Sequence, residues 1–433
     1  MQRRDVLEAV GAVGLLGSSL VSGCLQHPQA GATNDRGNGD ESNGEQNGQN
    51  GDEGENGDEG EIGDEGGVEW SHGIGGMVDA VAHGAVFGRE DFMADGAEGG
   101  VFALEVETGA HRWTYGETGG YTTYTSPAVA DAVYVGRGDD AIGSGTGELY
   151  ALEFDGEERW IRDVGSVYSR PRVVDDTVYV ASDDGIVRAF ETADGELSWR
   201  SEDLRSAYPD LTIATVHDDV VYVATAGLVG LDREDGSERW TYGTGDDRIR
   251  DATVVGGVAY LSTRDGVAAV VDGEEQWHVE FESNAFVQAV EDDRVFVGHE
   301  WDLHALDAAD GEEHWVLEDL EGMRVAVHGN VVYVGDDRLR AIEAVDGSER
   351  WRTTVRDRTP VESIVVADDP NDENGADGEH EVYVHTGDSR LHRFEPDGEE
   401  TWTETVEGKI RNYLVDRSVF VGTMEGIYAL DPG

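Results

Sequence analysis

Lysine is almost absent from this 433-residue sequence, and cysteine and proline are scarce. Lys409 is the single lysine, so nearly all of the 31 basic residues are arginines, and they stand against 93 acidic residues for a formal net charge of −62. Nucleic acids and anionic lipid headgroups are bound largely through lysine and arginine contacts to phosphate. The composition therefore argues against phosphate-backbone binding, and no nucleic acid is expected among the partners.

The same charge imbalance bears on the environment in which the chain folds. Like charges at this density destabilise a compact state through self-repulsion, whereas molar salt reduces the Debye length to roughly 3 Å and screens them. An acid excess with almost no lysine resembles the proteins of extreme halophiles. We interpret most of the carboxylates as a solvated surface suited to brine.

No run of apolar residues is long enough to cross a bilayer. The segment from Ala9 to Val21 is shorter than the roughly 20 residues that a spanning helix needs. It follows the pair Arg3 and Arg4, and a charged start before a short apolar stretch is typical of an export signal. The twin arginine resembles a Tat signal, although Gln2 and other neighbours of the pair depart from the usual pattern. Residues 1–24 are therefore expected to be a processed signal.

Cys24 ends that segment and is the only cysteine of the chain. Val21-Ser22-Gly23-Cys24 resembles a lipobox, in which the cysteine thiol receives a diacylglycerol. A single cysteine cannot form a disulfide within the mature domain. The sequence thus predicts a lipid anchor at Cys24 and a location on the extracellular face of the cell membrane.

Residues 25–66 contain few apolar side chains. From Gly31 onward they are mostly Gly, Asn, Asp and Glu, with near-repeats such as GDEGENGDEGEIGDEGG. Such a segment cannot bury enough surface to offset its ordering entropy. We expect a disordered acidic tether that holds the domain formed by residues 67–433 away from the membrane.

From Trp70 onward the sequence repeats itself at intervals of 36 to 51 residues, a period typical of propellers and other repeat arrays. Eight of the marking tryptophans follow a glycine by four residues, in motifs such as DGEERW and DGELSW. Asp-Gly favours the positive φ of a two-residue hairpin, so each motif is expected to join two strands. The tryptophans are Trp70, Trp113, Trp160, Trp199, Trp240, Trp277, Trp315, Trp351 and Trp402.

Valine-rich segments precede each hairpin, as in Val178-Tyr179-Val180 and Val331-Val332-Tyr333-Val334. Short continuous apolar runs of this kind fit strands that are covered on both faces. No stretch after Gly67 keeps a helical period, so the domain is predicted to be all-β.

The segment Ala305–Trp315 resembles the tryptophan-docking motif of pyrroloquinoline-quinone-type repeats. The resemblance implies that the alanine at position one and the glycine at position seven hold the indole at position eleven and join adjacent blades. Gly230 replaces the alanine before Trp240. Three units keep all three positions, Ala103–Trp113, Ala189–Trp199 and Ala341–Trp351, and three depart in length or residue, those that end at Trp160, Trp277 and Trp402.

The two ends of the repeat region are incomplete in complementary ways. The last unit stops at Gly433 before a tryptophan strand, while Trp70 lies just ahead of the first unit. The N-terminal strand can therefore complete the last blade, and ring closure removes exposed sheet edges. We predict a single closed β-propeller, monomeric, of eight or nine four-stranded blades with nine favoured.

The resemblance leaves two kinds of function open, because fold does not determine function. One kind is a dehydrogenase that holds pyrroloquinoline quinone and Ca²⁺; its relatives usually carry a vicinal disulfide that this chain cannot form, and we find no match to their catalytic motifs. The other is a lipid-anchored binding propeller of the outer-membrane-assembly branch. We favour a protein-binding or scaffold module without catalytic residues or cofactor, whose partner is an unidentified envelope protein, and a carbohydrate-binding module is a further alternative.

Metal sites are not favoured by the sequence. His299 and His304 flank Glu300-Trp301-Asp302, but no third ligand completes a zinc pattern. The acidic segment Asp368–Glu381 is rich in oxygen ligands, yet Asn374 occupies the position that an EF-hand reserves for glycine. We interpret it as a solvated loop and predict no metal site.

One face of the propeller is the candidate binding face. Loops that connect the second to the third strand are long in the first two units, and the connection between these units is rich in tyrosine. Aromatic residues and arginine are common at interface hot spots, although the tyrosines can equally pack within their own loops. The candidates are Tyr115, Tyr121, Tyr124, Arg89, Arg137 and Trp301.

Overall fold

The computed structural model describes residues 67–90, 99–116, 122–139, 146–204, 212–243, 249–320, 322–355, 359–368 and 380–433. Within these ranges the chain forms 37 strands, and it contains no helix that could cross a membrane. The predictions for Arg3, Arg4, Cys24, the tether, Tyr121 and residues 369–379 of the acidic segment fall outside the described residues.

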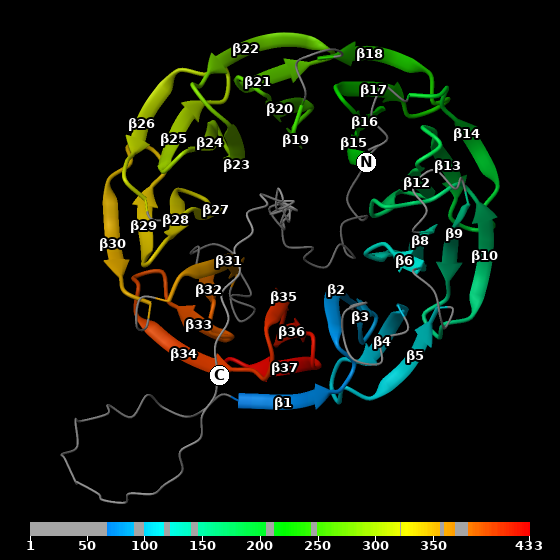
Figure 1. Cartoon of the computed structure of the whole chain (residues 1–433), viewed down its shortest axis with the longest axis horizontal. Coiled ribbons are helices and arrows are strands. Elements are labelled where there is room, and N and C mark those ends of the chain that lie inside the picture. The colour runs from blue at the N-terminus through cyan, green and yellow to red at the C-terminus, as the bar shows by residue number, and fades with distance from the viewer. Residues whose placement is uncertain are drawn as a thin grey trace, which may run out of the picture.

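The strands form nine antiparallel sheets, the blades, arranged in a closed ring (Figure 1). From the innermost strand outward they are blade 1, β2 (Gly76–Ala82), β3 (Ala85–Glu90), β4 (Val101–Glu105) and β5 (His111–Tyr115); blade 2, β6 (Thr122–Tyr124) with β7 (Ala128–Val129), β8 (Val133–Asp139), β9 (Gly147–Leu152) and β10 (Glu158–Asp163); blade 3, β11 (Arg172–Val174), β12 (Thr177–Ala181), β13 (Val187–Glu191) and β14 (Leu197–Arg200); blade 4, β15 (Thr212–His217), β16 (Val220–Ala224), β17 (Leu228–Asp232) and β18 (Glu238–Tyr242); blade 5, β19 (Asp251–Val255), β20 (Val258–Ser262), β21 (Gly266–Val271) and β22 (Glu274–Glu280); blade 6, β23 (Ala285–Glu291), β24 (Arg294–His299), β25 (Asp302–Asp307) and β26 (Glu313–Leu317); blade 7, β27 (Arg324–His328), β28 (Val331–Gly335), β29 (Leu339–Glu343) and β30 (Glu349–Thr353); blade 8, β31 (Val361–Asp368), β32 (His380–Thr386), β33 (Arg390–Phe394) and β34 (Glu400–Thr405); and blade 9, β35 (Ile410–Val415), β36 (Val419–Thr423), β37 (Ile427–Asp431) and β1 (Gly67–His72).

The ring closes in blade 9. The N-terminal strand β1 pairs antiparallel with β37, with Gly67 opposite Asp431 and His72 opposite Ile427. The two ends of the described chain thus meet in one sheet, at the foot of Figure 1. Both the closed all-β propeller and the favoured count of nine blades are confirmed.

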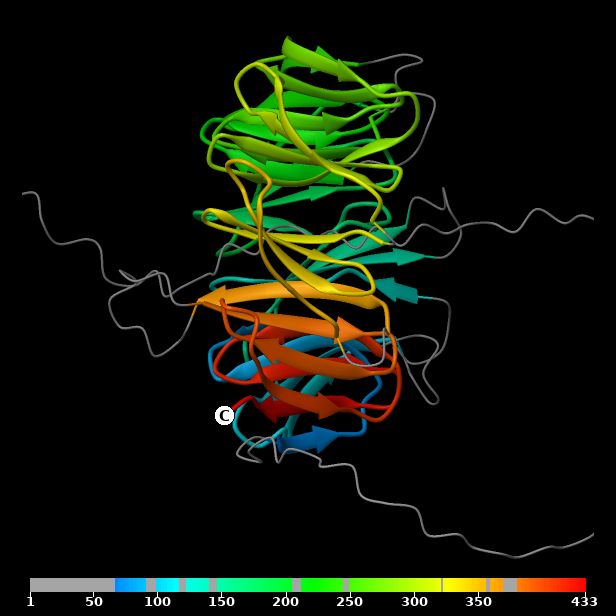
Figure 2. The same cartoon turned by 90° about the vertical axis from the view of Figure 1, so that its left-hand side faces the viewer.

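The hydrophobic core is divided among the interfaces between blades. Nine clusters of buried side chains each combine residues of two neighbouring blades, for example Tyr179 and Val187 of blade 3 with Val221 and Leu231 of blade 4. The valine-rich runs lie in strands covered on both faces, which explains their continuous apolar pattern. Figure 2 shows the resulting disc from the side, with the blades stacked face to face around the ring.

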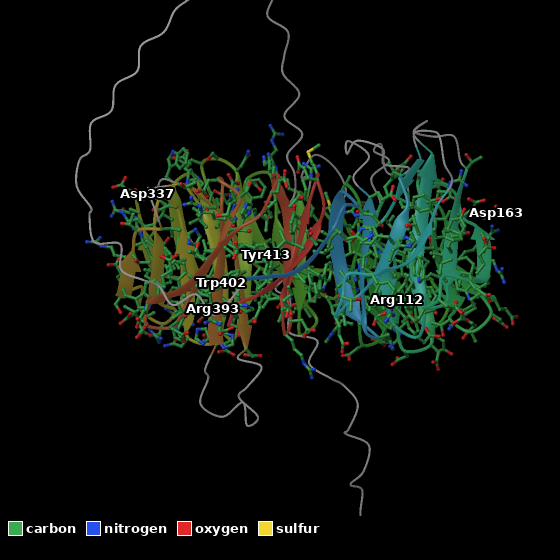
Figure 3. The ribbon with its side chains drawn as sticks, turned by 90° about the horizontal axis from the view of Figure 1, so that it is seen from below. Arg112, Asp163, Asp337, Arg393, Trp402 and Tyr413 are labelled. Carbon is green, nitrogen blue, oxygen red and sulfur yellow. The ribbon has the colours of Figure 1, made fainter. Side chains whose placement is uncertain are left out.

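The topology gives the disc two distinct faces. Connections from the outermost strand of one blade to the innermost strand of the next lie on one face, together with the turns between second and third strands; we call it the upper face. In Figure 3 it bears Asp163, at the end of β10, and Asp337, in the turn after β28, while Arg112 and Arg393 lie toward the lower face.

The turns before the tryptophan strands differ from the predicted two-residue hairpins. All eight motif glycines have positive φ, as in Gly195 at 68° and Gly236 at 72°. Seven of these turns nevertheless contain five residues, and only Asp272-Gly273 is a two-residue turn. The longer turns need the additional residues because one of their carbonyl groups is used to bind the neighbouring blade.

That bond joins each blade to the next. Seven tryptophans donate from the indole Nε1 to a backbone carbonyl in the five-residue turn of the following unit, at 2.7 to 3.0 Å. We call it the docking hydrogen bond. The motif glycine of that same following unit packs on the indole, so the glycine that contacts each tryptophan belongs to the next repeat, while the alanine opposite it belongs to its own.

Trp240 and Trp402 are the exceptions, since the buried Nε1 of each has no hydrogen-bond partner among the described residues. The turn that should accept from Trp240 is Asp272-Gly273, which is too short to present the carbonyl. No turn joins β37 to β1, because these strands come from opposite ends of the repeat region. Two of the three divergent units therefore still dock, with Trp160 bound to Thr192 and Trp277 bound to Ala308.

Candidate binding site at the axis of the ring

The tyrosines of the candidate face are held within blades 1 and 2. The hydroxyl of Tyr115 donates to Glu158 at 2.6 Å, and burial together with that carboxylate raises the pKa of the phenol. Tyr124 is buried, and its ring lies 6.3 Å from that of Tyr150. Tyr115 and Tyr124 thus pack against their own sheet, and their position favours the loop-packing alternative.

The other candidates are separated from one another. Arg137 pairs with Glu148 at 2.6 Å beside Tyr150. Trp301 lies in blade 6, on the turn between β24 and β25, and its exposed fraction of 63% is the largest among the exposed large hydrophobic residues. The structure therefore does not bring Trp301 together with the tyrosines of blades 1 and 2.

Arg89 belongs to a polar group near the axis. It lies on β3 and reaches Asp79 of the innermost strand β2, whose side chain is only 8% exposed. The Nε of Arg89 and Oδ2 of Asp79 are 3.4 Å apart, an ion-pair distance, but neither atom makes a hydrogen bond of normal geometry. Burial raises the pKa of the Asp79 carboxyl, while Arg89, Ser126 and Arg170 oppose that rise.

The inner wall is interrupted next to this group. In blade 2 the innermost position is divided between β6 and β7, both paired with β8, and Thr125, Ser126 and Pro127 lie between them. Asp79 itself lies at a register shift in β2. Bulges reorient side chains on a strand, and here the interruption lets Arg170 of blade 3 interact with Asp79 of blade 1.

Basic residues recur at the upper end of the innermost strands. They occupy blades 3, 5, 7 and 9, and all six lie within two residues of the first residue of their strand. Because every innermost strand runs in the same direction around the ring, these residues lie on the upper face around the axis. We name this set the axial collar: Arg170, Arg172, Arg250, Arg324, Lys409 and Arg411.

Several collar cations are without carboxylate partners. Most arginines elsewhere are paired, such as Arg159 with Asp131 at 2.5 Å and Arg239 with Asp232 at 2.7 Å. By contrast, Arg170, Arg172, Arg250 and Lys409 have no carboxylate within 4.0 Å among the described residues.

The collar residues that do bind protein groups bind the next blade. Arg172 donates to the Ala214 carbonyl of blade 4, and Arg324 donates to the Glu362 carbonyl of blade 8. Burial lowers the pKa of the Arg172 guanidinium, and Arg170 lowers it further. Arginine stays protonated in proteins despite such a shift.

Exposed aromatic rings accompany the collar. Tyr168 precedes Arg170 by two residues and is 51% exposed. The guanidinium of Arg250 lies over the ring of Phe286 at 5.8 Å, and Phe286 is exposed. The sequence offered a signal for this site, a cation beside the valine-rich inner strand of alternate units, which the search for long loops did not detect.

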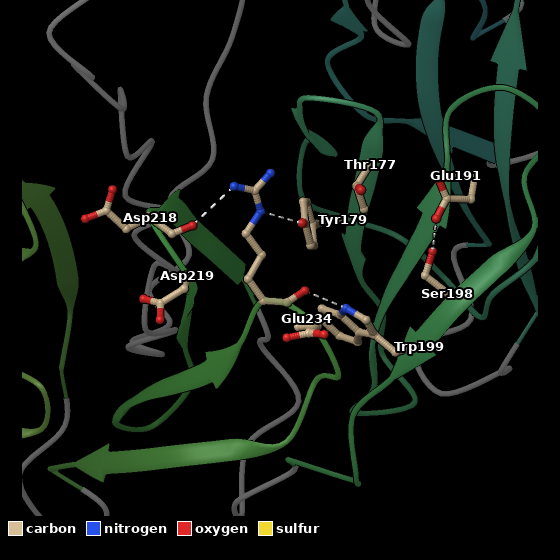
Figure 4. A pocket seen from close by; sticks show the side chains of 9 residues that line it. Thr177, Tyr179, Glu191, Ser198, Trp199, Asp218, Asp219 and Glu234 are labelled. Atoms are coloured by element: carbon tan, nitrogen blue, oxygen red, sulfur yellow. Dashed lines mark hydrogen bonds between the residues drawn. The ribbon is translucent and has the colours of Figure 1, made fainter.

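A pocket of about 400 Å³ lies on the lower part of the disc, between blades 3 and 4 (Figure 4). Trp199 and Tyr179 line it, and Arg233 crosses it, donating from Nε to the Tyr179 hydroxyl at 3.0 Å. The backbone carbonyl of Arg233 accepts the docking hydrogen bond of Trp199. These polar groups already serve the blade interface, so we assign the pocket to blade docking.

The described residues do not form a calcium or zinc site. Among them, no group of three or more His, Cys, Asp or Glu side chains could hold a metal ion. His299 and His304 have ring centroids 6.0 Å apart, but His299 contacts Ser283 and His304 contacts Glu313. Calcium takes six to eight oxygen ligands, whereas the acidic residues Asp79, Asp251 and Glu362 lie in three separate blades near the axis. This residue set does not fit the quinone-and-calcium chemistry of a dehydrogenase.

Comparison with known proteins places these features in a family. The chain is 28% identical to the outer membrane protein assembly factor BamB of Burkholderia pseudomallei over 271 residues, which covers 56% of this chain and 67% of the relative. It is 28% identical over 283 residues to BamB of Yersinia pestis, covering 58% of this chain and 70% of the relative. The crystal structure of the computationally designed protein Ika8 has a TM-score of 0.50 at 13% identity, covers 84% of this chain and 98% of its own, and shows likeness of fold alone.

The family comparison covers most of the propeller. Residues 97–261 and 263–412 match a family model described as outer membrane protein assembly factor BamB. These two stretches include the tryptophan strands from Trp113 to Trp402. Since they make up well over half of the sequence, the chain belongs to the repeat family described as outer membrane protein assembly factor BamB.

Proposed function

We propose that this chain is a protein-binding or scaffold module, anchored in the cell envelope by lipid on Cys24, that binds its partner on the upper face at the axis of the ring. The observation that carries the proposal is the axial collar. In a chain with three acidic residues for each basic one, four collar cations on one face have no carboxylate partner among the described residues. Charge left uncompensated at one place favours recognition of a partner there.

Family membership supports the same function. The relatives in Burkholderia pseudomallei and Yersinia pestis are assembly factors of the outer membrane by name. A role in assembly requires binding other proteins and needs no catalytic group. For this chain we propose the binding role and the envelope location, with the predicted signal and lipobox as the means of reaching it.

A carbohydrate-binding module is the second candidate. Trp301 favours it, because an indole that is 63% exposed offers a flat surface on which a sugar ring can stack. Trp301 is in blade 6, away from the paired tyrosines of blades 1 and 2, so a single aromatic residue supports this alternative.

Site-specific photocrosslinking tests the proposed face. A benzophenone-bearing amino acid replaces Tyr168, on the upper face, or Val345, in the turn after β29 on the lower face; the two are 51% and 54% exposed. We expect irradiation of intact cells to yield one envelope-protein adduct, identified by mass spectrometry, from position 168 and not from position 345. Equal adducts at both positions, or none at either, would contradict a binding site on the upper face.

A further inference from the structure

We propose that the axial collar binds an extended acidic segment of the protein partner. This inference rests on the proposed function and adds the chemistry of the segment that the partner presents. Each step of the argument uses the positions and pairing of the collar residues.

The charge near the axis is the reverse of that of the chain. Acidic residues outnumber basic ones by three to one overall, yet six basic residues lie at the upper ends of the innermost strands. The acidic residues closest to them are few: Asp79, Asp251 and Glu362. Arg89 and Arg170 share the single carboxylate of Asp79, so positive charge remains there after pairing.

The distribution of the collar favours a chain over a small anion. Its members lie in blades 3, 5, 7 and 9, which are spread around the ring with one blade between each pair (Figure 1). A phosphate or a dicarboxylate can contact neighbouring cations only, whereas a peptide with several carboxylates can reach cations of several blades. Arginine pairs with carboxylates through a planar fork, which suits the side chains of Asp and Glu.

Apolar rings beside the cations indicate that the segment also carries apolar side chains. Phe286 lies under Arg250, and Tyr168 lies next to Arg170 along the chain. Both rings are exposed. Aromatic and arginine side chains together are the residue types most often found at interface hot spots.

Binding of a model peptide to the purified domain tests the inference. The probe is a fluorescein-labelled peptide of Glu-Glu-Phe repeats, compared with a matched peptide of Gln-Gln-Phe repeats, at the lowest salt concentration at which the protein stays folded. We expect fluorescence anisotropy to show saturable binding of the glutamate peptide only. Equal binding of the glutamine peptide would overturn the proposal, as would displacement of the probe by succinate at a concentration similar to that of the unlabelled peptide.

Two triple variants locate the binding site. Arg170→Gln, Arg250→Gln and Lys409→Gln together remove three collar charges, while Arg200→Gln, Arg264→Gln and Arg417→Gln remove three charges from exposed arginines outside the collar. We expect the collar variant to lose at least about tenfold in affinity and the control to keep it within roughly twofold. Equal loss in both would show a general charge effect and would overturn the proposal. Arg250→Gln alone should give a partial loss and serves if the triple variant unfolds.

The same variants separate this inference from the proposed function. If the collar variant loses peptide binding and also loses the photocrosslinked adduct at position 168, the collar is the contact for the partner. An adduct that survives the triple substitution would overturn the collar proposal and leave the proposed function standing. Peptide binding without any adduct in cells would contradict the proposed function instead.

Discussion

The indole Nε1 of Trp199 donates a hydrogen bond of 2.9 Å to the carbonyl oxygen of Arg233, one blade further along the chain. Gly236, in the same turn as Arg233, packs on the ring of Trp199 with φ of 72°. A tryptophan of one blade and a glycine-containing turn of the next thus form each complete docking contact. The contact recurs around the ring, except at Trp240 and Trp402, whose Nε1 atoms have no partner among the described residues.

Replacing Gly236 with alanine should destabilise the propeller. A Cβ at this position would lie 2.3 Å from Cε3 of Trp199, so the indole would have to move. Gly256→Ala is a matched control, since Gly256 also has positive φ, at 57°, but nothing lies within 4 Å of a Cβ built there. We expect Gly236→Ala to lower the free energy of unfolding by roughly 1–3 kcal/mol more than Gly256→Ala. Equal effects in denaturant titrations would mean that backbone strain, and not indole packing, explains the glycine.

Trp199→Phe and Trp240→Phe should differ in cost. Both substitutions remove similar apolar area, but only the first leaves a carbonyl without its donor, because the Nε1 of Trp240 has no partner. An unsatisfied buried polar group costs about 1–3 kcal/mol, so Trp199→Phe should be more destabilising by that amount. Thermal and denaturant unfolding measure the difference, and an equal loss in the two variants would show that the docking hydrogen bond adds nothing to packing.

The fold could be predicted largely from the sequence because one motif repeats nine times. The spacing of the tryptophans, the motif glycines and the valine-rich strands agree with one another, and agreement among local signals is what specifies a fold. The turn length was predicted wrongly in most units. A glycine with positive φ occurs in turns of several lengths, and the docking carbonyl that requires the longer turn lies in a neighbouring blade, which local sequence does not reveal.

The site was harder to predict for a geometric reason. Tyr115 and Tyr124 are close in sequence to long loops, but their hydroxyl and ring contacts to Glu158 and Tyr150 come from the facing strands of blade 2. The collar residues Arg170 and Arg250 are 80 positions apart in sequence and come together on one face only through closure of the ring. Long-range closure, and not local pattern, creates that surface.

Salt should stabilise the folded chain strongly. With a net charge of −62, self-repulsion is large at low ionic strength and is screened once the Debye length falls to about 3 Å in molar salt. We expect the melting temperature to rise steeply between low and molar salt, with sodium, potassium or choline chloride equally effective. A melting temperature that does not depend on salt would contradict adaptation to brine.

Membrane attachment should depend on Cys24. The Cys24→Ser variant has no thiol to receive lipid, so the protein should leave the membrane fraction or remain as an uncleaved precursor. Cell fractionation and mass spectrometry of the N-terminal peptide measure both outcomes, and Ser22→Ala, within the same lipobox, is a control that keeps the thiol. An unchanged membrane fraction with an unchanged lipid adduct in Cys24→Ser would contradict the anchor.

His385 gives the folded state a defined response to acid. Its imidazole is 8% exposed at the upper end of β32, in blade 8. Burial lowers the pKa of His385 to about 4; Glu362 and Asp388 partly oppose that shift, while Lys409 and His392 add to it. The unfolded chain has the ordinary pKa of 6.5, so it binds more protons than the folded protein between about pH 6.5 and 4.

Stability contributed by neutral His385 is therefore fully present above the unfolded pKa and is lost as the pH falls toward 4. The shift corresponds to about 3 kcal/mol at most. In His385→Gln this loss disappears, so the free energy of unfolding of the wild type minus that of the variant should decrease by up to about 3 kcal/mol from pH 7 to pH 4. The many carboxylates titrate in both proteins and cancel in the difference. His217→Gln, at an exposed position, should follow the wild type, and a difference for His385→Gln that stays constant with pH would show that the buried imidazole is already protonated in the folded state.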